Sequence, residues 1–332
     1  MPTRIQFRRD TAANWTSANP VLAQGELGLE TDTGAYKVGN GSSTWTALSY
    51  WALPATVNTL LMNAQSDPSA PGANTMDFYA KSISGRIMPK WKSPSGFDTP
   101  VQPAIFQNTF FLVTPNTGTA AGAIGGSLTS TGTLSTPTPT TTSYGVTTNF
   151  VSAATGGSTA GTGSALASYA RGTDPALAPG FFMVQRLVFP DANYGTGATG
   201  ARFFVGFTDR TMAQSVGADN DSGSRAGFAL STNLSETNWM FTTRDGTTES
   251  RTSTGIAFAV NKLYDFYVFC PSGGSSISWR IDNLTDGTTA SASTSANLPG
   301  TGTLMRAGFQ IATLTTTARN VRMKKIYVET DL

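Results

Sequence analysis

The 332-residue sequence contains no histidine and only one cysteine. Without histidine the chain cannot use Ser-His-Asp or Cys-His nucleophile systems, a histidine general base or histidine metal ligands. Cys270 cannot form an intramolecular disulfide, and its place in the apolar run LYDFYVFC predicts a buried, inert thiol. We expect no cofactor. The absence of histidine does not exclude glycoside hydrolysis, because a pair of carboxylates can carry out that reaction.

Charged residues are also scarce, at 13% of the chain and with a formal net charge of +2. An average globular protein has about 25% charged residues. Nucleic-acid binding needs clustered Lys and Arg, and the groups near Arg4 and Arg322 are too small for that. We therefore expect no nucleic-acid partner. The abundance of Thr, Ser and Gly instead favours a β-protein with many turns.

Long apolar runs are missing as well. The longest, such as FYVFC, fall far short of the roughly 20 residues of a membrane-spanning helix. The opening MPTRIQFRRDTAANW lacks the apolar core of a signal peptide. The sequence therefore predicts a protein made in the cytoplasm, without a signal peptide and without membrane insertion.

The first fifty residues contain a compact β unit. Leu27 and Leu29 alternate with polar residues and glycine, which predicts a half-buried strand, and Gly34 suits the turn that follows it. DTAANW predicts a turn or one helical turn capped by Asp10. A unit of this size has a marginal core. Since no disulfide is available, we expect it to associate with other chains.

Three stretches of this unit, RIQFRRDTAANW, GELGLETDTGAYKVGNGSSTW and LSYW, resemble the N-terminal domain of the major tropism determinant family. That domain begins many phage tail-fibre and receptor-binding proteins. The family usually has an acidic residue where this chain has Asn40, between the two glycines of the last turn. The resemblance covers residues 1–51 and implies a β-prism-like domain that trimerises and joins a fibre to the virion.

The next segment, residues 52–99, is expected to be a linker and neck. It starts rich in Pro, Ser, Asn and Gly, and Pro89 and Pro94 exclude one long helix. Residues 99–170 contain no charged residue. They could be a disordered Thr/Ser tract, but spread aromatic residues and abundant threonine favour ordered β structure.

The remaining chain, residues 100–332, has the pattern of one large antiparallel β-sandwich. In SISWRID, for example, Ile277 and Trp279 share one face of a strand, which places Trp279 in the core. LYDFYVFC is apolar on both faces and is expected to be a central strand. A change of apolar parity between Met323 and Ile326 predicts a bulge. The series of strands resembles the concanavalin-like C-terminal domain of phage tail fibres, which implies a lectin-like, jelly-roll fold.

Glycan contacts are expected at Asn193, Tyr194 and Trp239, since sugar sites pair an aromatic face with amide and hydroxyl groups. The alternative for Trp239, on a strand, is a core position. Asp245 and Glu249 are two carboxylates that could hydrolyse a glycoside, but Asp245-Gly246 is equally typical of a hairpin turn. We assign no catalytic residue.

A weak metal candidate is the group Asp219, Asn220 and Asp221, whose oxygen atoms could bind calcium. The group lacks the spacing and terminal Glu of an EF-hand, so an ordinary polar turn is favoured and no metal is expected.

The function that we predict is that of a phage virion fibre protein without enzymatic activity. It would attach to tail, baseplate or capsid proteins through its N-terminal domain, as a homotrimer. Its sandwich would bind a host surface polysaccharide or other receptor. Two alternatives stay open, namely a purely structural fibre or decoration protein and a glycan-hydrolysing tailspike.

Overall fold

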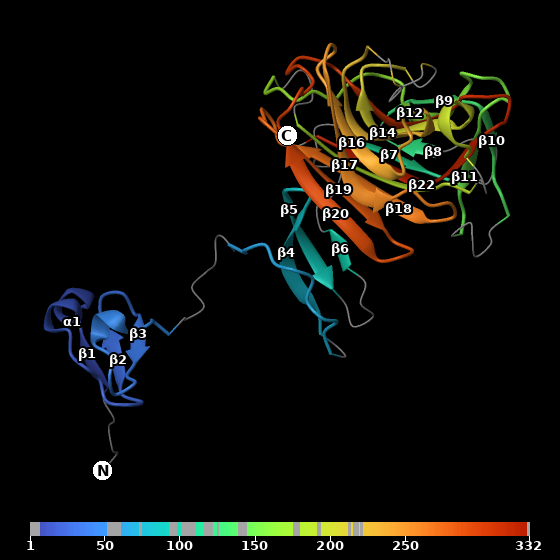
Figure 1. Ribbon diagram of the computed structural model, residues 1–332. Coiled ribbons are helices and arrows are strands. Elements are labelled where there is room, and N and C mark those ends of the chain that lie inside the picture. Colours follow the sequence, from blue (N-terminus) through green and yellow to red (C-terminus); the bar gives the residue numbers. More distant parts are fainter. Residues whose placement is uncertain are drawn as a thin grey trace. The chain divides into compact units, whose positions relative to one another are not determined.

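The computed structural model describes residues 7–51, 61–72, 75–92, 98–100, 110–115, 122–124, 126–138, 145–174, 180–190, 194–211, 214, 219 and 222–330. The chain divides into two compact units, residues 1–62 and 63–332. Strands dominate the second unit, and no helix among the described residues is long and apolar enough to cross a membrane (Figure 1).

The first unit is built on a three-stranded sheet. Strand β1 (Arg8–Asp10) pairs in parallel with β2 (Leu27–Glu30), which pairs antiparallel with β3 (Tyr36–Val38). Helix α1 (Ala12–Ala18) follows β1, and a 3₁₀ turn, η1 (Trp45–Ala47), comes after the sheet. The helix cap differs from the prediction. Thr11, not Asp10, is the N-cap, because its hydroxyl accepts the Asn14 amide hydrogen.

The core of this unit is small and aromatic. Trp15 and Trp45 stack with ring centroids 4.3 Å apart, and Leu22 completes the buried cluster. Gly28 is required beside them, since a Cβ there would lie 2.5 Å from the Trp45 ring. Lys37 is 4% exposed, and its Nζ donates to the Trp45 carbonyl at 2.8 Å. Burial lowers the pKa of Lys37, although the nearby Glu30 charge acts to raise it.

Lys37→Met is expected to lower the free energy of unfolding of this unit by about 1–3 kcal/mol, because it removes the buried hydrogen bond from Lys37 to the Trp45 carbonyl, which then keeps only the longer bond from the Leu48 amide, at 3.3 Å. Thermal unfolding followed by near-ultraviolet circular dichroism would measure the loss. Arg9→Ala, on an exposed strand position, is the control and should change little. Equal melting temperatures for both variants would contradict the role assigned to Lys37.

The second unit contains a sandwich of two antiparallel sheets. One has nine strands. Its main path runs β10 (Thr133–Ser135), β11 (Thr148–Val151), β22 (Asn320–Glu329), β13 (Phe181–Val188), β18 (Leu263–Cys270), β19 (Ile277–Asn283) and β20 (Thr288–Thr294). Strand β7 (Phe110–Thr114) pairs with β22 and with β8 (Gly122–Ile124). The other sheet has seven strands, in the order β17 (Glu249–Ala257), β16 (Asn238–Arg244), β15 (Arg225–Ser231), β14 (Ala201–Thr208), β21 (Arg306–Thr313), β12 (Thr159–Ser164) and β9 (Leu128–Thr131).

This architecture confirms the predicted all-β sandwich. The uncharged stretch supplies β7 to β12, so its described part is ordered β structure. Strand β18 lies inside the sheet, between β13 and β19, as predicted. The bulge is also confirmed. Arg186 pairs with Lys325 and the next residue, Leu187, pairs with Met323, so Lys324 is the extra residue of the bulge. Cys270 and Trp279 are buried between the two sheets.

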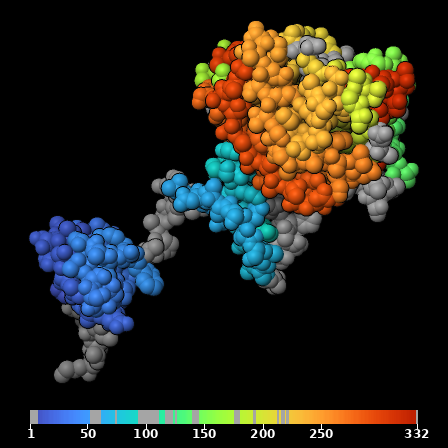
Figure 2. Space-filling model, in the orientation of Figure 1, coloured from blue at the N-terminus to red at the C-terminus, as the bar shows by residue number. Residues whose placement is uncertain are grey.

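A third sheet packs on the nine-stranded one, on the face turned away from the main core. It contains β4 (Asp77–Ile83), β5 (Arg86–Lys92) and β6 (Asp98–Pro100). Met88 of β5 packs against Phe182 and Phe269, and Arg86 forms an ion pair with the buried Glu329. Figure 2 shows this hairpin lying directly against the sandwich. Part of the segment expected to be a neck is therefore packed on the sandwich within the same compact unit.

Candidate functional site

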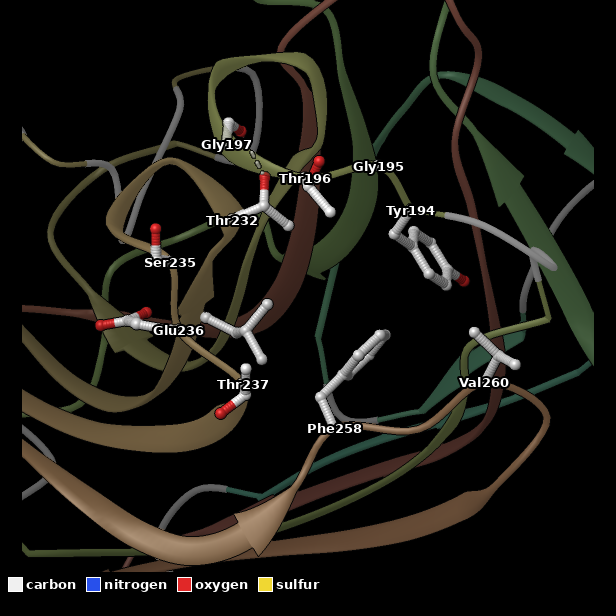
Figure 3. A pocket seen from close by; sticks show the side chains of 11 residues that line it. Tyr194, Gly195, Thr196, Gly197, Thr232, Ser235, Glu236, Thr237, Phe258 and Val260 are labelled. Carbon is white, nitrogen blue, oxygen red and sulfur yellow. Dashed lines mark hydrogen bonds between the residues drawn. The ribbon is translucent and has the colours of Figure 1, made fainter.

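A cavity of about 460 Å³ lies at the meeting point of three connections of the sandwich (Figure 3). The connections are those between β13 and β14, between β15 and β16, and between β17 and β18. The lining residues are Tyr194, Gly195, Thr196, Gly197, Leu230, Thr232, Ser235, Glu236, Thr237, Phe258 and Val260. Strands that are distant in sequence thus supply one shared pocket.

Two aromatic rings form one side of the cavity. The centroids of Tyr194 and Phe258 lie 5.3 Å apart, with ring planes at 76°. The Tyr194 hydroxyl donates to the Asn320 carbonyl at 2.8 Å, which fixes its ring. The Phe258 amide donates to the Thr237 carbonyl at 2.9 Å. Val260 and Leu230 add apolar surface, so this wall is rigid and mostly apolar.

The opposite side is polar (Figure 3). Glu236 accepts a bidentate pair of hydrogen bonds from Arg251, at 2.5 Å on Oε1 and 2.7 Å on Oε2. Its Oε2 also accepts the Ser231 amide hydrogen at 2.7 Å. The hydroxyls of Thr196, Ser235 and Thr237 lie on exposed residues around it. The Glu236 carboxylate points away from the two aromatic rings (Figure 3) and is engaged by Arg251 and the Ser231 amide, so the accessible polar groups of this side are hydroxyls.

The loops that carry these groups are tied together. Thr232 Oγ1 donates to the Gly197 carbonyl at 2.8 Å and accepts the Ala201 amide hydrogen at 3.0 Å. Gly200 packs so closely on Thr232 that a Cβ there would lie 2.0 Å from its Oγ1. The sequence needs glycine at that point for the two loops to meet.

Arg251 extends the polar side into a charge network across the seven-stranded sheet. Its Nη1 lies 3.2 Å from Glu249 Oε1, and the fully buried Arg225 lies 2.9 Å from the same oxygen. Burial acts to raise the pKa of Glu249, but hydrogen bonds from Thr242 and Arg225 and the two arginine charges lower it overall. Glu249 thus stays ionised and holds Arg251 from the side opposite Glu236.

The structure contradicts the sugar contact predicted at Trp239. Its side chain is 0% exposed and packs in the core, 4.9 Å from the Phe266 ring and 5.1 Å from the Phe189 ring. Its strand parity matches that of Phe241, which also faces the core. Tyr194 does line the cavity, although it is only 4% exposed. Asn193 lies outside the described residues.

Of the three residues in the weak metal candidate, the structure describes Asp219, whose carboxylate is engaged in hydrogen bonds. Asp219 Oδ2 accepts from Arg202 at 2.6 Å and from Asn233 at 2.7 Å. Burial acts to raise the pKa of Asp219, but these hydrogen bonds lower it overall. Asn220 and Asp221 lie outside the described residues. Within the described ranges, no three His, Cys, Asp or Glu side chains are grouped as metal ligands.

Asp245 serves the hairpin turn between β16 and β17. Its carboxylate accepts the amide hydrogens of Thr248 and Thr247, each at 2.7 Å. These hydrogen bonds and that of the Thr247 hydroxyl lower the pKa of Asp245 to about 2. A general acid needs a raised pKa. The pair Asp245 and Glu249 therefore lacks the proton donor that glycoside hydrolysis requires.

Sequence reasoning missed Glu236, Thr237 and Phe258. Each looks ordinary in its local stretch, because TNLSETN is a polar turn and IAFAV is a strand end. Only the pairing of β16 with β17, which places Asn238 opposite Ala257, brings these segments together.

Comparison with known proteins finds phage sequences for the N-terminal unit. Residues 5–43 match the family model of the major tropism determinant N-terminal domain. This confirms the predicted resemblance. A hyaluronoglucosaminidase of Streptococcus pyogenes phage H4489A is 43% identical over 54 residues, and one of phage H10403 is 40% identical over 50 residues. These matches cover 16% and 15% of this chain and 15% of each relative.

Solved structures similar to the chain include plant lectins. Peanut lectin aligns with a TM-score of 0.45 at 11% identity, covering 67% of this chain and 97% of that one. Lectin II from Ulex europaeus aligns with a TM-score of 0.44 at 13% identity, covering 68% and 100%. A streptococcal bacteriophage hyaluronidase has a TM-score of 0.15 at 32% identity over 22% of each chain.

One prediction is overturned by these comparisons. We expected a protein without enzymatic activity, but both curated relatives are named as hyaluronoglucosaminidases. Their likeness is confined to about the first sixth of the chain, in its N-terminal region, and so excludes the cavity residues.

Proposed function

We propose that this protein is a component of a phage virion that binds a carbohydrate on the host surface at the cavity between β13–β14, β15–β16 and β17–β18. The match at residues 5–43 supports a place in the virion, with attachment through the N-terminal unit to tail, baseplate or capsid proteins. The single observation that carries the binding proposal is the cavity itself, with its fixed aromatic wall and its exposed threonine and serine residues.

The chemistry of the cavity suits a sugar ring. A sugar has apolar C–H faces and a rim of hydroxyl groups. Phe258 is half-buried and offers the edge or face of a ring to the C–H side. Thr196, Ser235 and Thr237 are exposed and can exchange hydrogen bonds with sugar hydroxyls. Few polar groups on an otherwise apolar wall is the usual composition of a small-ligand site.

Thr237→Trp is expected to reduce glycan binding at least about tenfold, because the indole fills the mouth of the cavity. Thr237 is exposed, so its replacement removes little buried surface. Thr252→Trp, at an exposed position on β17, is the matched control and should bind like wild type. Binding of the full chain to host cells and to a glycan array measures both. Unchanged binding by the Thr237 variant would exclude the cavity.

Hydrolysis of a host glycan is the second candidate, favoured by the names of the phage relatives. It needs two carboxylates about 5–10 Å apart. Among the described residues that line the cavity, Glu236 is the only carboxylate. Release of reducing sugar from host polysaccharide by the full chain would support this candidate, and binding without turnover would support the first.

A homotrimer is expected, because the buried apolar cluster in the described part of the N-terminal unit has three side chains, and a unit with so small a core gains stability from association. Light scattering coupled to size exclusion should give about three times the chain mass of 34.7 kDa. A single peak at the chain mass at micromolar concentration would contradict this expectation.

A further inference from the structure

We infer that the chain has a second binding site, for a phosphate or sulfate group, between the β4–β5 hairpin and the outer face of the nine-stranded sheet. A cavity of about 290 Å³ lies there. Among the described residues that line it, Arg280 is the only charged one. The serines of its lining are Ser82, Ser84, Ser278, Ser291 and Ser293. This second cavity shares no residue with the proposed glycan site.

Strand register places most of these polar groups on one face of the sheet. The Trp279 ring of β19 points into the main core, so its neighbours Ser278 and Arg280 point outward. The pairing of β19 with β20 sets Ser293 opposite Ser278. It likewise sets Ser291 opposite Arg280. Residues opposite one another have Cβ atoms about 5 Å apart, so these side chains form one compact group.

The turn of the hairpin forms the other wall of the cavity. Gly85 contacts β19, since a Cβ there would lie 3.0 Å from Ser278 Oγ. Ser84 has a φ of 51°, a left-handed conformation that residues other than glycine rarely adopt. It is 7% exposed, and its buried hydroxyl has no hydrogen-bond partner in the described part of the chain. Because an unpaired buried hydroxyl is destabilising, a ligand oxygen that accepts from Ser84 would remove that cost.

Arg280 keeps hydrogen-bond donors for a ligand. Its Nε donates to Asp282 Oδ1 at 2.7 Å, and its side chain is 27% exposed. No described residue accepts a hydrogen bond from its Nη1 or Nη2. Arg251, by contrast, directs all three of its nitrogens to Glu236 and Glu249. Since a guanidinium binds phosphate oxygens in a two-pronged manner, we expect the Nη groups of Arg280 to hold the anion.

The charges around Arg280 also favour an anion. Asp282 offsets one positive charge through its ion pair. Asp67 attracts Arg280 electrostatically as well. However, the Asp67 carboxylate is paired with Lys81 and lies 4.0 Å from Lys90 Nζ. Three cations thus interact with two carboxylates here, so a bound oxyanion would meet an excess of positive charge.

The lining favours an oxyanion over a sugar ring. Trp279 is the only aromatic residue among the described lining residues, and its ring lies in the core at 5% exposure. The cavity therefore offers no ring face for stacking. A phosphate or sulfate has several acceptor oxygens that can meet donors on both walls. Such a group could arrive as a free ion or as a substituent of a host surface polymer.

Isothermal titration calorimetry of the full chain with sodium phosphate and sodium sulfate, at matched ionic strength, tests the site. Wild type should show saturable binding of at least one of them. Glucose 6-phosphate and glucose 6-sulfate, with glucose as the unmodified control, form the second arm. Tighter binding of a modified sugar than of its free ion would support a polymer substituent, and equal affinities would support the free ion. Absence of saturable binding by every anion would overturn the inference.

Ser291→Trp should weaken anion binding at least about tenfold, because the indole of this exposed residue fills the cavity. Thr252→Trp, exposed on β17, is the matched control and should bind like wild type. Thr237→Trp should also leave anion binding unchanged, because it fills the other cavity. Anion binding that Thr237→Trp abolishes, or that Ser291→Trp does not affect, would place the anion elsewhere and refute the site.

Two further variants test the donors themselves. Arg280→Met should weaken anion binding about tenfold or more, the usual effect of losing a charge-assisted hydrogen bond. Ser84→Gly removes the unpaired hydroxyl at a position where glycine is favoured. It should be at least as stable as wild type and bind the anion about threefold or more weakly. It therefore keeps the test decisive if Arg280→Met lowers stability, and wild-type anion affinity in both variants would contradict the assignment.

Discussion

Trp239→Ala is expected to lower the free energy of unfolding of the sandwich by about 3–5 kcal/mol, the usual cost of removing a buried aromatic side chain. Trp239 is fully buried among the rings of Phe189, Phe266 and Phe203. The two sheets meet around it, so the cavity left behind cannot collapse without moving both. Denaturant unfolding followed by far-ultraviolet circular dichroism would measure the loss.

Trp239→Phe is the matched control. Trp239 Nε1 is buried and has no hydrogen-bond partner among the described residues, so phenylalanine gives up no hydrogen bond. We expect this variant to lose less than about half of what alanine loses. If Trp239→Ala kept wild-type stability and lost sugar binding, the residue would belong to the binding site, contrary to its burial.

Arg86→Ala is expected to cost about 3–5 kcal/mol, the effect of removing one partner of a buried ion pair. Glu329 is 1% exposed, and among the described residues its side chain would keep only the hydrogen bond from Tyr327. Arg86 also lies over the Phe182 ring, 5.2 Å from its centroid, so the hairpin would lose packing as well. Unfolding of residues 63–332 in denaturant would register the change.

The double variant Arg86→Met with Glu329→Leu separates charge from packing. It removes both charges and keeps apolar volume, and such replacements are often neutral or stabilising. We expect it to recover most of the lost stability. Failure to recover would mean that the hairpin depends on the ion pair itself. Either way, a fragment that begins near Thr99 would expose Phe182 and Phe269, whereas one that begins at Asn63 would keep them covered.

Period-two patterns predicted much of the sandwich because each strand has one face in the core. Ile277 and Trp279 are buried as expected, and the parity change after Met323 marks a real bulge. The same physics explains the error at Trp239. A tryptophan that could stack on a sugar and one that packs in the core look alike in sequence, and its parity with Phe241 was the informative signal.

The site was less predictable because its parts come from separate connections. Tyr194 follows β13, Glu236 precedes β16, and Phe258 follows β17. Their approach depends on strand order, which periodicity does not specify. The packing of the β4–β5 hairpin on the nine-stranded sheet could not be predicted from the sequence for a related reason. Arg86 meets Glu329 across 243 positions of sequence, and one charge in a turn-rich segment does not reveal its partner.

Strand β22 has a consequence for how the protein is made. It lies between β11 and β13 in the nine-stranded sheet, pairs also with β7, and supplies Glu329 to the hairpin. All the strands that it joins leave the ribosome before it does. Until β22 has been synthesised, the edges of these strands that pair with it have no partner strand. Unpaired strand edges can pair with other chains and so promote aggregation. Premature termination before Asn320 should therefore yield aggregates and not a smaller folded domain, and late nonsense mutations should be as severe as early ones.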